Sequence, residues 1–358
     1  MNIREATRSY EDWLASKIAV VKGDLDYKHE QMAAAAFRFL RATYYRWLQL
    51  WPQVCPDLAK APQVLAVGDL HVENFGTWRD TEGRLIWGVN DFDEAYPESY
   101  AIDLVRLAAS ARLAGDENEL RIKPEDACEM ILEGYSKSLQ SGGEPFVLAE
   151  KHKWLRDLAL NDLRDPVQFW KKMEDLPAAA ATVPASAPKL LEDLLPERGL
   201  DSRLKRRRAG LGSLGRQRIL ALAQWRGGYV AREAKSLLPS AHVWAAGPKA
   251  EPKIWYQAIL EQSVRVRDPY VTARADWILR RLAPDCSRIE LASLPKEHDE
   301  ARLLRAMGAE TANIHLGTKG AAAQNQQDLK KRSGDWLFQA SKDMAKAVKQ
   351  DWDQWRKP

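Results

Sequence analysis

The sequence predicts an α+β fold in two lobes, with a mostly helical lobe first and a small β-rich lobe second. Apolar residues recur at helical spacings through the first half, whereas the chain after residue 200 has short apolar runs and glycine turns. Between them, a stretch rich in proline, alanine and serine is typical of a linker. We therefore expect a first lobe at 1–176, a linker at 177–200, a second lobe at 201–296, and C-terminal helices at 297–358 that pack back on the first lobe.

The first lobe is expected to combine helices with a β-hairpin. Residues 28–51 carry apolar side chains at helical spacing, and Pro52 is expected to end this helix. The apolar runs 64–67 and 85–89 are typical of buried strands, and we expect them to pair as a hairpin with acidic groups at its ends. A further helix is expected at 97–114, opened by a proline.

The later elements follow from the same patterns. Helical spacing continues over 124–172. The second lobe is expected to hold strands on either side of a Gly-Gly turn, followed by helices and one more hairpin. The expected strands lie at 218–225 and 229–235, the hairpin at 276–282 and 287–291, and the helices at 252–264, 297–316 and 334–355.

The bulk composition suits a folded protein in a reducing compartment. The chain has 358 residues, of which 45% are hydrophobic, enough for one large or two ordinary domains. A net charge of +4 suits a phosphate-bearing ligand but is too small to indicate nucleic acid as a partner. The three cysteines are an odd number without metal-ligand spacing. With no signal-peptide core and no apolar run that could cross a bilayer, we expect a cytoplasmic protein without a membrane partner.

The stretch 67–93 places acidic and amide side chains between apolar runs. Asp69 and Asn74 are five residues apart, the spacing at which a kinase catalytic loop carries its base and a metal ligand. Asp91-Phe92-Asp93 takes the place of the metal-binding Asp-Phe-Gly sequence. Because Mg²⁺ prefers oxygen ligands, we predict Asp69 as the catalytic base and Asn74 and Asp91 as magnesium ligands. The alternative is that these side chains only cap turns.

Two neighbouring side chains leave alternatives open. Asp93 either binds metal as well or caps the turn. His71 either orients the candidate base or binds substrate, or it has a purely structural role.

A glycine-rich sequence in the second lobe can cradle phosphates with its backbone N–H groups. We expect a nucleotide to contact Gly210, Gly212, Ser213 and Gly215. A dinucleotide-binding loop has the same glycine spacing, but that loop is followed by a helix. Here an apolar run and a Gly-Gly turn follow, which favours a β-hairpin and the kinase form of the loop.

The strand after the Gly-Gly turn carries the candidate phosphate cation. Arg232 and Lys235 are separated by an odd number of residues, so only one of them can point inward from a strand. We expect Arg232 to contact the phosphates. Glu261 is a candidate partner for the strand cation, as a helix glutamate is in kinases.

The order of these segments is reversed relative to an ordinary kinase, in which the glycine loop precedes the acidic loop. A site depends on geometry and not on chain order. The predicted fold is therefore a protein-kinase-like two-lobe fold that is circularly permuted.

Four motifs together resemble the bacterial domain of unknown function 2252 family. They are Gly68-Asp-Leu-His-Val-Glu-Asn-Phe-Gly76, Asn90-Asp-Phe-Asp-Glu94, Asp103-Leu-Val-Arg-Leu-Ala-Ala-Ser110 and Gly210-Leu-Gly-Ser-Leu-Gly215. The acidic motifs are also similar to those of aminoglycoside phosphotransferases. The resemblance implies a kinase-like ATP-binding fold with no settled substrate, Asp69 as base, and Asn74 and Asp91 as metal ligands. One departure is Arg232-Glu233-Ala234, where the family usually has Lys-Glu-Ala.

The leading hypothesis is an ATP- and Mg²⁺-dependent phosphotransferase that acts on a hydroxyl of an unidentified small-molecule or protein acceptor. Nucleotidyl transfer by the same site is a close variant. A second hypothesis is a pseudokinase that senses nucleotide and regulates a partner. It is favoured by Arg232, which stands where the family usually has lysine. A third is RNA binding through the basic run 203–208. It ranks last because no aromatic residues interleave that run.

Overall fold

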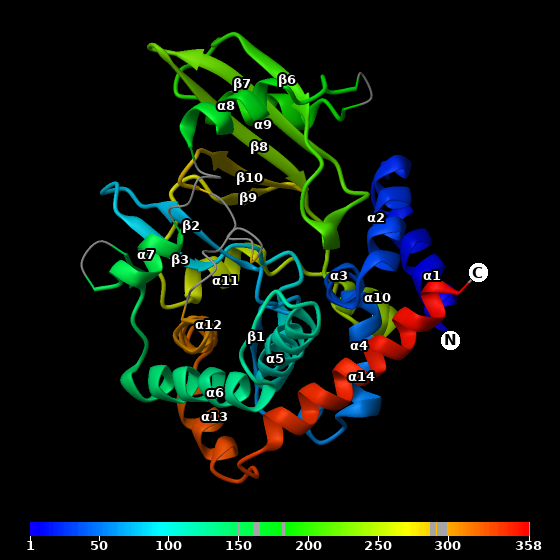
Figure 1. Ribbon diagram of the computed structural model, residues 1–358. Helices are drawn as coiled ribbons and strands as arrows, with labels where there is room; N and C mark the ends of the chain where they lie inside the picture. Colours follow the sequence, from blue (N-terminus) through cyan, green and yellow to red (C-terminus); the bar gives the residue numbers. More distant parts are fainter. Residues whose placement is uncertain (149–150, 160–164, 181–182, 287–290, 292–298, 358) are drawn as a thin grey trace.

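The computed structural model is an α+β protein, as predicted (Figure 1). A helical body holds two small sheets, and a five-stranded sheet with its own helices lies at one end of it. None of the helices in the described part of the chain is long and apolar enough to span a membrane. The structure describes residues 1–148, 151–159, 165–180, 183–286, 291 and 299–357.

The helix predicted at 28–51 is divided into three shorter helices. They are α2 (Lys22–Ala34), α3 (Ala36–Ala42) and α4 (Tyr44–Val54), and α1 (Ile3–Ala15) precedes them. The backbone is extended at Ala35 (φ −157°, ψ 148°) and leaves the helical region again at Thr43 (φ −126°, ψ 42°). Pro52 lies inside α4 and does not end it. The prediction of one continuous helix was wrong. Tertiary packing divides the segment, although its apolar residues follow a single helical spacing.

The hairpin predicted from 64–67 and 85–89 does not form. β1 (Gln63–Ala66) pairs antiparallel with β4 (Tyr96–Ser99). β3 (Leu85–Val89) instead lies between β2 (Phe75–Arg79) and β5 (Phe146–Val147). The residues expected to open a helix at Pro97 belong to β4, and α5 (Tyr100–Asp116) starts after Ser99, whose side chain accepts from Ala101 N. Residues 67–74 therefore connect β1 to β2, and residues 90–95 connect β3 to β4.

The five-stranded antiparallel sheet has the order β6-β7-β8-β10-β9. The strands predicted at 218–225 and 229–235 are confirmed as β7 and β8, while 287–291 lies almost wholly outside the described residues. The strand bounds are β6 (Ser202–Arg206), β7 (Arg218–Trp225), β8 (Gly228–Ser236), β9 (Thr272–Arg274) and β10 (Trp277–Leu282).

Both faces of this sheet are covered by helices that precede it in the chain. Leu191 of α9 (Ser186–Leu194) packs with Ala234 on one face, and Met173 of α8 (Pro166–Glu174) packs with Ala231 on the other. The segment expected to be a linker adds to the sheet edge, because Pro177 O accepts from Arg206 N at 2.8 Å. Helix α8 and the linker segment thus belong structurally with the sheet.

The remaining helices complete the body and support the acidic stretch from below. Helix α6 (Pro124–Ser141) crosses α12 (Glu300–His315) at Gly134 and Gly308, where any side chain would meet the backbone of the partner helix. This close crossing brings the end of α12 beneath β1 and β3. The other helices are α7 (Lys153–Ala159), α10 (Ala241–Ala246), α11 (Tyr256–Gln262), α13 (Ala321–Leu329) and α14 (Trp336–Arg356).

Candidate functional site

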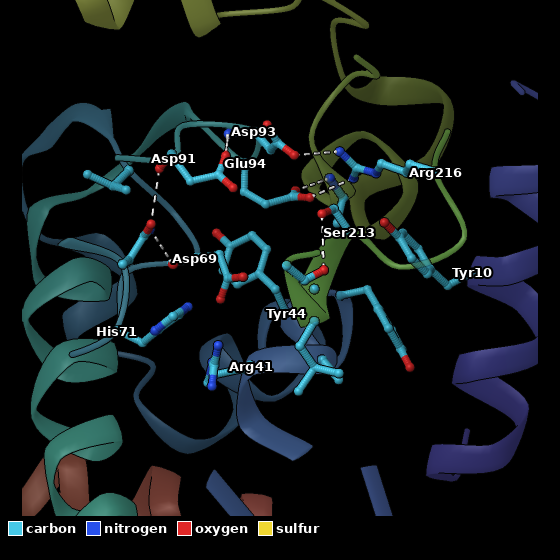
Figure 2. Close-up of a pocket in the computed structure, with 18 residues that line it drawn as sticks. Tyr10, Arg41, Tyr44, Asp69, His71, Asp91, Asp93, Glu94, Ser213 and Arg216 are labelled. Atoms are coloured by element: carbon cyan, nitrogen blue, oxygen red, sulfur yellow. Dashed lines mark hydrogen bonds and ion pairs between the residues drawn. The ribbon is translucent and has the colours of Figure 1, made fainter. Parts of the chain in front are cut away.

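The acidic stretch and the glycine loop face each other across one pocket, although more than a hundred residues separate them in the chain (Figure 2). We call it the central pocket. A Cβ atom built on Gly212 would lie 3.1 Å from Asp69 Oδ2 and 2.9 Å from Arg41 O. The sequence-predicted residues that line the pocket are Asp69, His71, Asn74, Asp91, Asp93, Gly210, Gly212 and Ser213.

Asp103 on α5 fixes the loop that carries the candidate base. Its two carboxylate oxygens accept hydrogen bonds from Val67 N at 2.7 Å and Gly68 N at 2.8 Å. Gly68 has a positive φ of 84°, and a Cβ there would lie 2.9 Å from Tyr44 Oη. The chain therefore leaves β1 in one defined direction, with Asp69 pointing into the central pocket.

The candidate base is oriented by a buried arginine. Arg106 is completely buried and donates from Nε to Asp69 Oδ1 at 2.9 Å, and its terminal nitrogen also pairs with Oδ1. Its guanidinium lies 4.9 Å from the ring centroids of both Tyr44 and Trp47. Because both contacts end on Oδ1, Oδ2 is the atom that faces the glycine loop at Gly212.

Two of the candidate metal ligands, Asn74 and Asp93, each supply an unsatisfied oxygen atom. Asn74 donates from Nδ2 to the backbone oxygens of Asp69 at 3.1 Å and Asp91 at 3.3 Å, which turns its Oδ1 away from them. Asn74 Oδ1 and Asp93 Oδ1 are buried and accept no hydrogen bond from any residue that the structure describes. Buried polar atoms are rarely left unpaired. We therefore expect these two oxygen atoms to contact a cation or a hydrogen-bond donor of a ligand.

This oxygen set fits a hard cation such as Mg²⁺. Two carboxylates and an amide leave room for water and phosphate oxygens, which is how Mg²⁺ is usually bound. Among the described residues, no group of three or more His, Cys, Asp and Glu side chains could hold a metal by itself. Burial first, and then the charge of Asp91, raise the pKa of Asp93 to about 6.

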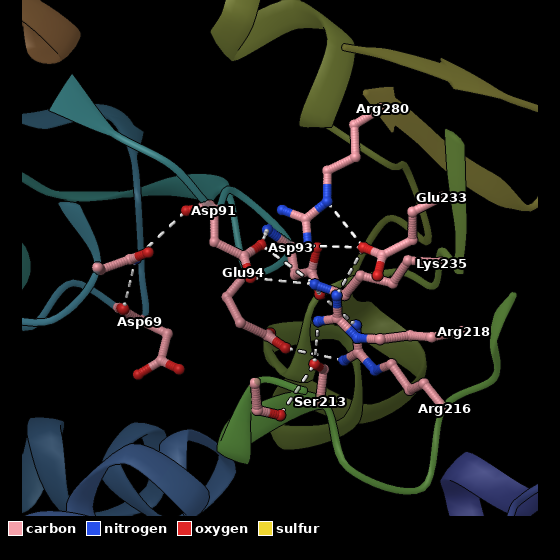
Figure 3. A network of polar contacts seen from close by, with 12 residues as sticks. Asp69, Asp91, Asp93, Glu94, Ser213, Arg216, Arg218, Glu233, Lys235 and Arg280 are labelled. Atoms are coloured by element: carbon pink, nitrogen blue, oxygen red, sulfur yellow. Dashed lines mark hydrogen bonds and ion pairs between the residues drawn. The ribbon is translucent and has the colours of Figure 1, made fainter. Parts of the chain in front are cut away.

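Lys235, and not Arg232, reaches the acidic side chains from β8 (Figure 3). Its Nζ lies 3.1 Å from Asp91 Oδ2 and also pairs with Asp93. Arg232 points to the opposite face of the sheet, where it donates to Leu194 O at 2.9 Å and stacks on Tyr270. The expectation that Arg232 holds the phosphates is therefore wrong, because strand alternation gives the inner face to Lys235.

Arg216, which immediately follows the glycine loop, was missed in the sequence. It is buried and donates to Asp93 Oδ2 and to Glu94 Oε1, both at 3.0 Å. These bonds fasten the end of the glycine loop to the second acidic segment. Local spacing gave no signal of this pairing, which joins residues 122 and 123 positions apart.

The glycine loop itself is divided between two environments. Gly210 has a positive φ of 75°, and its carbonyl accepts from Ser213 Oγ at 3.2 Å. Gly215 faces α2 and not the pocket, since a Cβ there would lie 2.6 Å from Leu25. Gly215 O also accepts from Val21 N at 2.9 Å. Contrary to expectation, Gly215 has a packing role, and the pocket wall is formed by 210–213.

A chain of buried polar groups supports the acidic stretch from the helical body. His315 on α12 contacts Asp103 Oδ2 through Nε2 at 2.9 Å and Tyr135 Oη through Nδ1 at 2.8 Å. All three side chains are buried. His71 lies closer to the pocket, and its Nδ1 accepts from Glu73 N at 3.2 Å. That contact matches the structural alternative for His71.

The basic run 203–208 is largely engaged within the protein. Arg206 and Arg208 both pair with Asp24 of α2, and Arg207 pairs with Glu233 of β8. Charges neutralised in this way contribute little to a surface that would attract RNA.

Gly212 tests how closely the two segments must approach. We expect Gly212→Ala to lower the free energy of unfolding by about 1–3 kcal/mol, because the new methyl group meets a backbone oxygen that cannot rotate away. Gly228→Ala is the matched control, since a Cβ there meets nothing within 4 Å. Urea denaturation of both variants measures the difference. Equal stability would mean that the glycine loop does not rest against Arg41 of α3 and Asp69.

Part of the chain matches a known family model. Residues 21–182 match a family described as "Uncharacterized protein conserved in bacteria (DUF2252)", which agrees with the motifs of the acidic stretch. Neither the curated proteins nor the solved structures contain a match.

Proposed function

Starting from a chain whose residues 21–182 match an uncharacterised bacterial family, we propose an ATP- and Mg²⁺-dependent transferase. It moves a phosphate-bearing group of ATP onto a hydroxyl of a small-molecule or protein acceptor that is not identified. One observation carries the proposal: a candidate base, the unsatisfied oxygen atoms of Asn74 and Asp93, and a glycine loop line the same pocket. Turn caps would not need to converge in this way.

The sheet arrangement supports a permuted kinase-like fold. In protein kinases a glycine loop covers the phosphates and the phosphate lysine stands on the third strand. Here the glycine loop joins β6 to β7, and Lys235 lies on the next strand, β8. The acidic segments, which follow in a kinase, precede the sheet in this chain. The same parts in a different order are what a circular permutation would produce.

Each residue has a defined role in this proposal. Mg²⁺ would be held by Asn74, Asp91 and Asp93, and when bound it neutralises charge on the phosphates. Asp69 accepts the proton of the acceptor hydroxyl on Oδ2, while Arg106 holds the carboxylate in place through Oδ1. The backbone of 210–213 closes the pocket against water.

The acceptor has a matching wall on the other side of the pocket. Tyr44 Oη and Arg41 Nε are buried and have no acceptor among the described residues. Both side chains line the central pocket together with Tyr10 and Tyr45. These donors suit the oxygen atoms of an acceptor, and the tyrosine rings give it an apolar surface.

A nucleotide sensor without turnover is the second candidate. It is favoured by Lys235, which neutralises the carboxylates that a metal would need. The two candidates differ in one result. A sensor binds ATP without consuming it, whereas the transferase consumes ATP when Mg²⁺ is present.

Asp91 tests the metal assignment. We expect Asp91→Asn to weaken Mg²⁺–ATP binding by roughly tenfold or more, since even the partners of metal ligands carry effects of that size. Isothermal titration with Mg²⁺–ATP measures the change. Asp116→Asn, an exposed aspartate paired with Lys349 on the helical body, is the control. Equal affinity in all three proteins would remove Asp91 from the metal site.

A further inference from the structure

A second cavity adjoins the central pocket at the glycine loop and is lined in part by residues of β7 and β10. Gly210 lines both cavities, and Asn90 lines the second one directly beside Asp91 of the first. Arg207, Arg218 and Arg280 line the second cavity, and we call it the arginine pocket. Figure 3 shows the side chains of Arg218 and Arg280 converging on Glu233.

The arginine pocket carries an excess of positive charge. Its three guanidiniums share the single carboxylate of Glu233, at 2.6 Å from Arg207, 3.0 Å from Arg218, and 2.8 Å from Arg280 Nε. Glu233 is fully buried. Three positive charges against one negative leave a surplus of two. Among the described residues, the other charged side chains that line the pocket are Arg281 and Asp268, and their charges cancel.

One of these arginines also has an unused donor. Arg218 is 4% exposed, and its Nε has no acceptor among the described residues. Its two terminal nitrogens are engaged by Glu233 and by Ser213 Oγ of the glycine loop. Burial, reinforced by the neighbouring Arg280 and Arg207, lowers the pKa of Arg218 to about 10. A buried donor and surplus positive charge are both satisfied by an anion.

A nucleoside triphosphate that spanned the two cavities would lie in one of two directions. In one direction the nucleoside lies in the arginine pocket and the γ-phosphate reaches Asp69. In the other, the β- and γ-phosphates lie in the arginine pocket and the α-phosphate reaches Asp69. Arginine forks bind phosphate bidentately, and surplus positive charge attracts the anionic end of a nucleotide more strongly than its uncharged base. The surplus charge therefore favours the second direction.

We propose that the arginine pocket holds the β- and γ-phosphates of a nucleoside triphosphate, so that the protein transfers a nucleotidyl group and releases pyrophosphate. This inference rests on the proposed function and specifies its reaction. The acceptor hydroxyl oxygen bonds to the α-phosphorus, and the bond from the α-phosphorus to the α,β-bridging oxygen breaks. The bond electrons leave with pyrophosphate, and the hydroxyl proton passes to Asp69 Oδ2.

The experiment compares ligands and variants of the full chain by isothermal titration in Mg²⁺. The probes are ATP, pyrophosphate and AMP. We expect pyrophosphate to bind wild type and to compete with ATP. Arg280→Gln and Arg207→Gln should each weaken ATP and pyrophosphate by roughly tenfold or more, with AMP changed much less. Arg203→Gln is the control, because Arg203 lies on β6 but pairs with the half-buried Glu174 outside the pocket.

The outcomes separate this inference from the proposed function. Absence of any Mg²⁺–ATP binding overturns both. ATP binding without pyrophosphate competition, or with affinity unaffected by both arginine variants, overturns the inference alone. Melting temperatures show whether the variants fold. If the variants do not fold, competition between pyrophosphate and ATP on the wild-type protein still tests the inference. Among the products of ATP turnover, AMP or a nucleotidylated acceptor with pyrophosphate supports the inference, and ADP with orthophosphate contradicts it.

Discussion

Asp69→Asn is expected to lower the rate of ATP turnover by roughly 10²- to 10⁴-fold, the usual contribution of a positioned general base. Asparagine keeps the shape of the side chain and can still accept from Arg106 through Oδ1. What it loses is the carboxylate oxygen that faces Gly212, where the acceptor proton would be taken up. The substitution therefore removes proton transfer and leaves the nucleotide contacts of the glycine loop in place.

Two measurements check this expectation. Steady-state ATP consumption gives turnover, and titration with Mg²⁺–ATP gives affinity, which we expect to change by no more than a few fold. Asp116→Asn serves as the surface control. If turnover survives Asp69→Asn, the proton is accepted elsewhere. If turnover and affinity fall together, the effect is on the fold of the pocket and not on the base.

Asp103→Ala should have the largest effect on stability, about 3–5 kcal/mol of the free energy of unfolding. Asp103 is completely buried and accepts from Val67 N and Gly68 N while its Oδ2 also contacts His315. Alanine leaves two buried N–H groups and Nε2 of His315 without a partner. The cost falls on the turn that delivers the candidate base into the central pocket.

Denaturant unfolding of Asp103→Ala and Asp103→Asn tests this role. Asparagine keeps one acceptor oxygen and should therefore lose less stability than alanine. A loss below about 1 kcal/mol for alanine would mean that the acidic stretch is held by other contacts. Loss of Mg²⁺–ATP binding in a folded Asp103→Asn variant would show that the turn also positions the site.

Both halves of the candidate site, the acidic stretch and the glycine loop, could be predicted from the sequence. Asp69 and Asn74 carry a fixed spacing, and the glycines of 210–213 precede an apolar run and a tight turn, so each half has a local signature. The structure places these halves against one pocket. Strands β7 and β8 were also predictable, because their apolar runs flank a Gly-Gly turn.

The failures share a physical cause, which is pairing between distant segments. Alternation allowed either Arg232 or Lys235 to face inward, and only the sheet register decides. The sequence analysis did not predict β2 and paired β1 with the wrong strand, because a hydrophobic run does not determine which strand it pairs with. His315 supports the turn before Asp69 from the other end of the chain, and no local spacing could reveal that contact.

The joint role of the acidic stretch and the glycine loop is tested most directly by a crystal structure of the full chain with Mn²⁺ and a non-hydrolysable ATP analogue. The anomalous signal of manganese locates the metal independently of the nucleotide. We expect Mn²⁺ bound by Asn74 Oδ1 and Asp91, phosphate against the backbone of 210–213, and Lys235 turned from the carboxylates to a phosphate. Manganese away from Asn74 and Asp91, or phosphates that do not contact the glycine loop, would contradict a shared site.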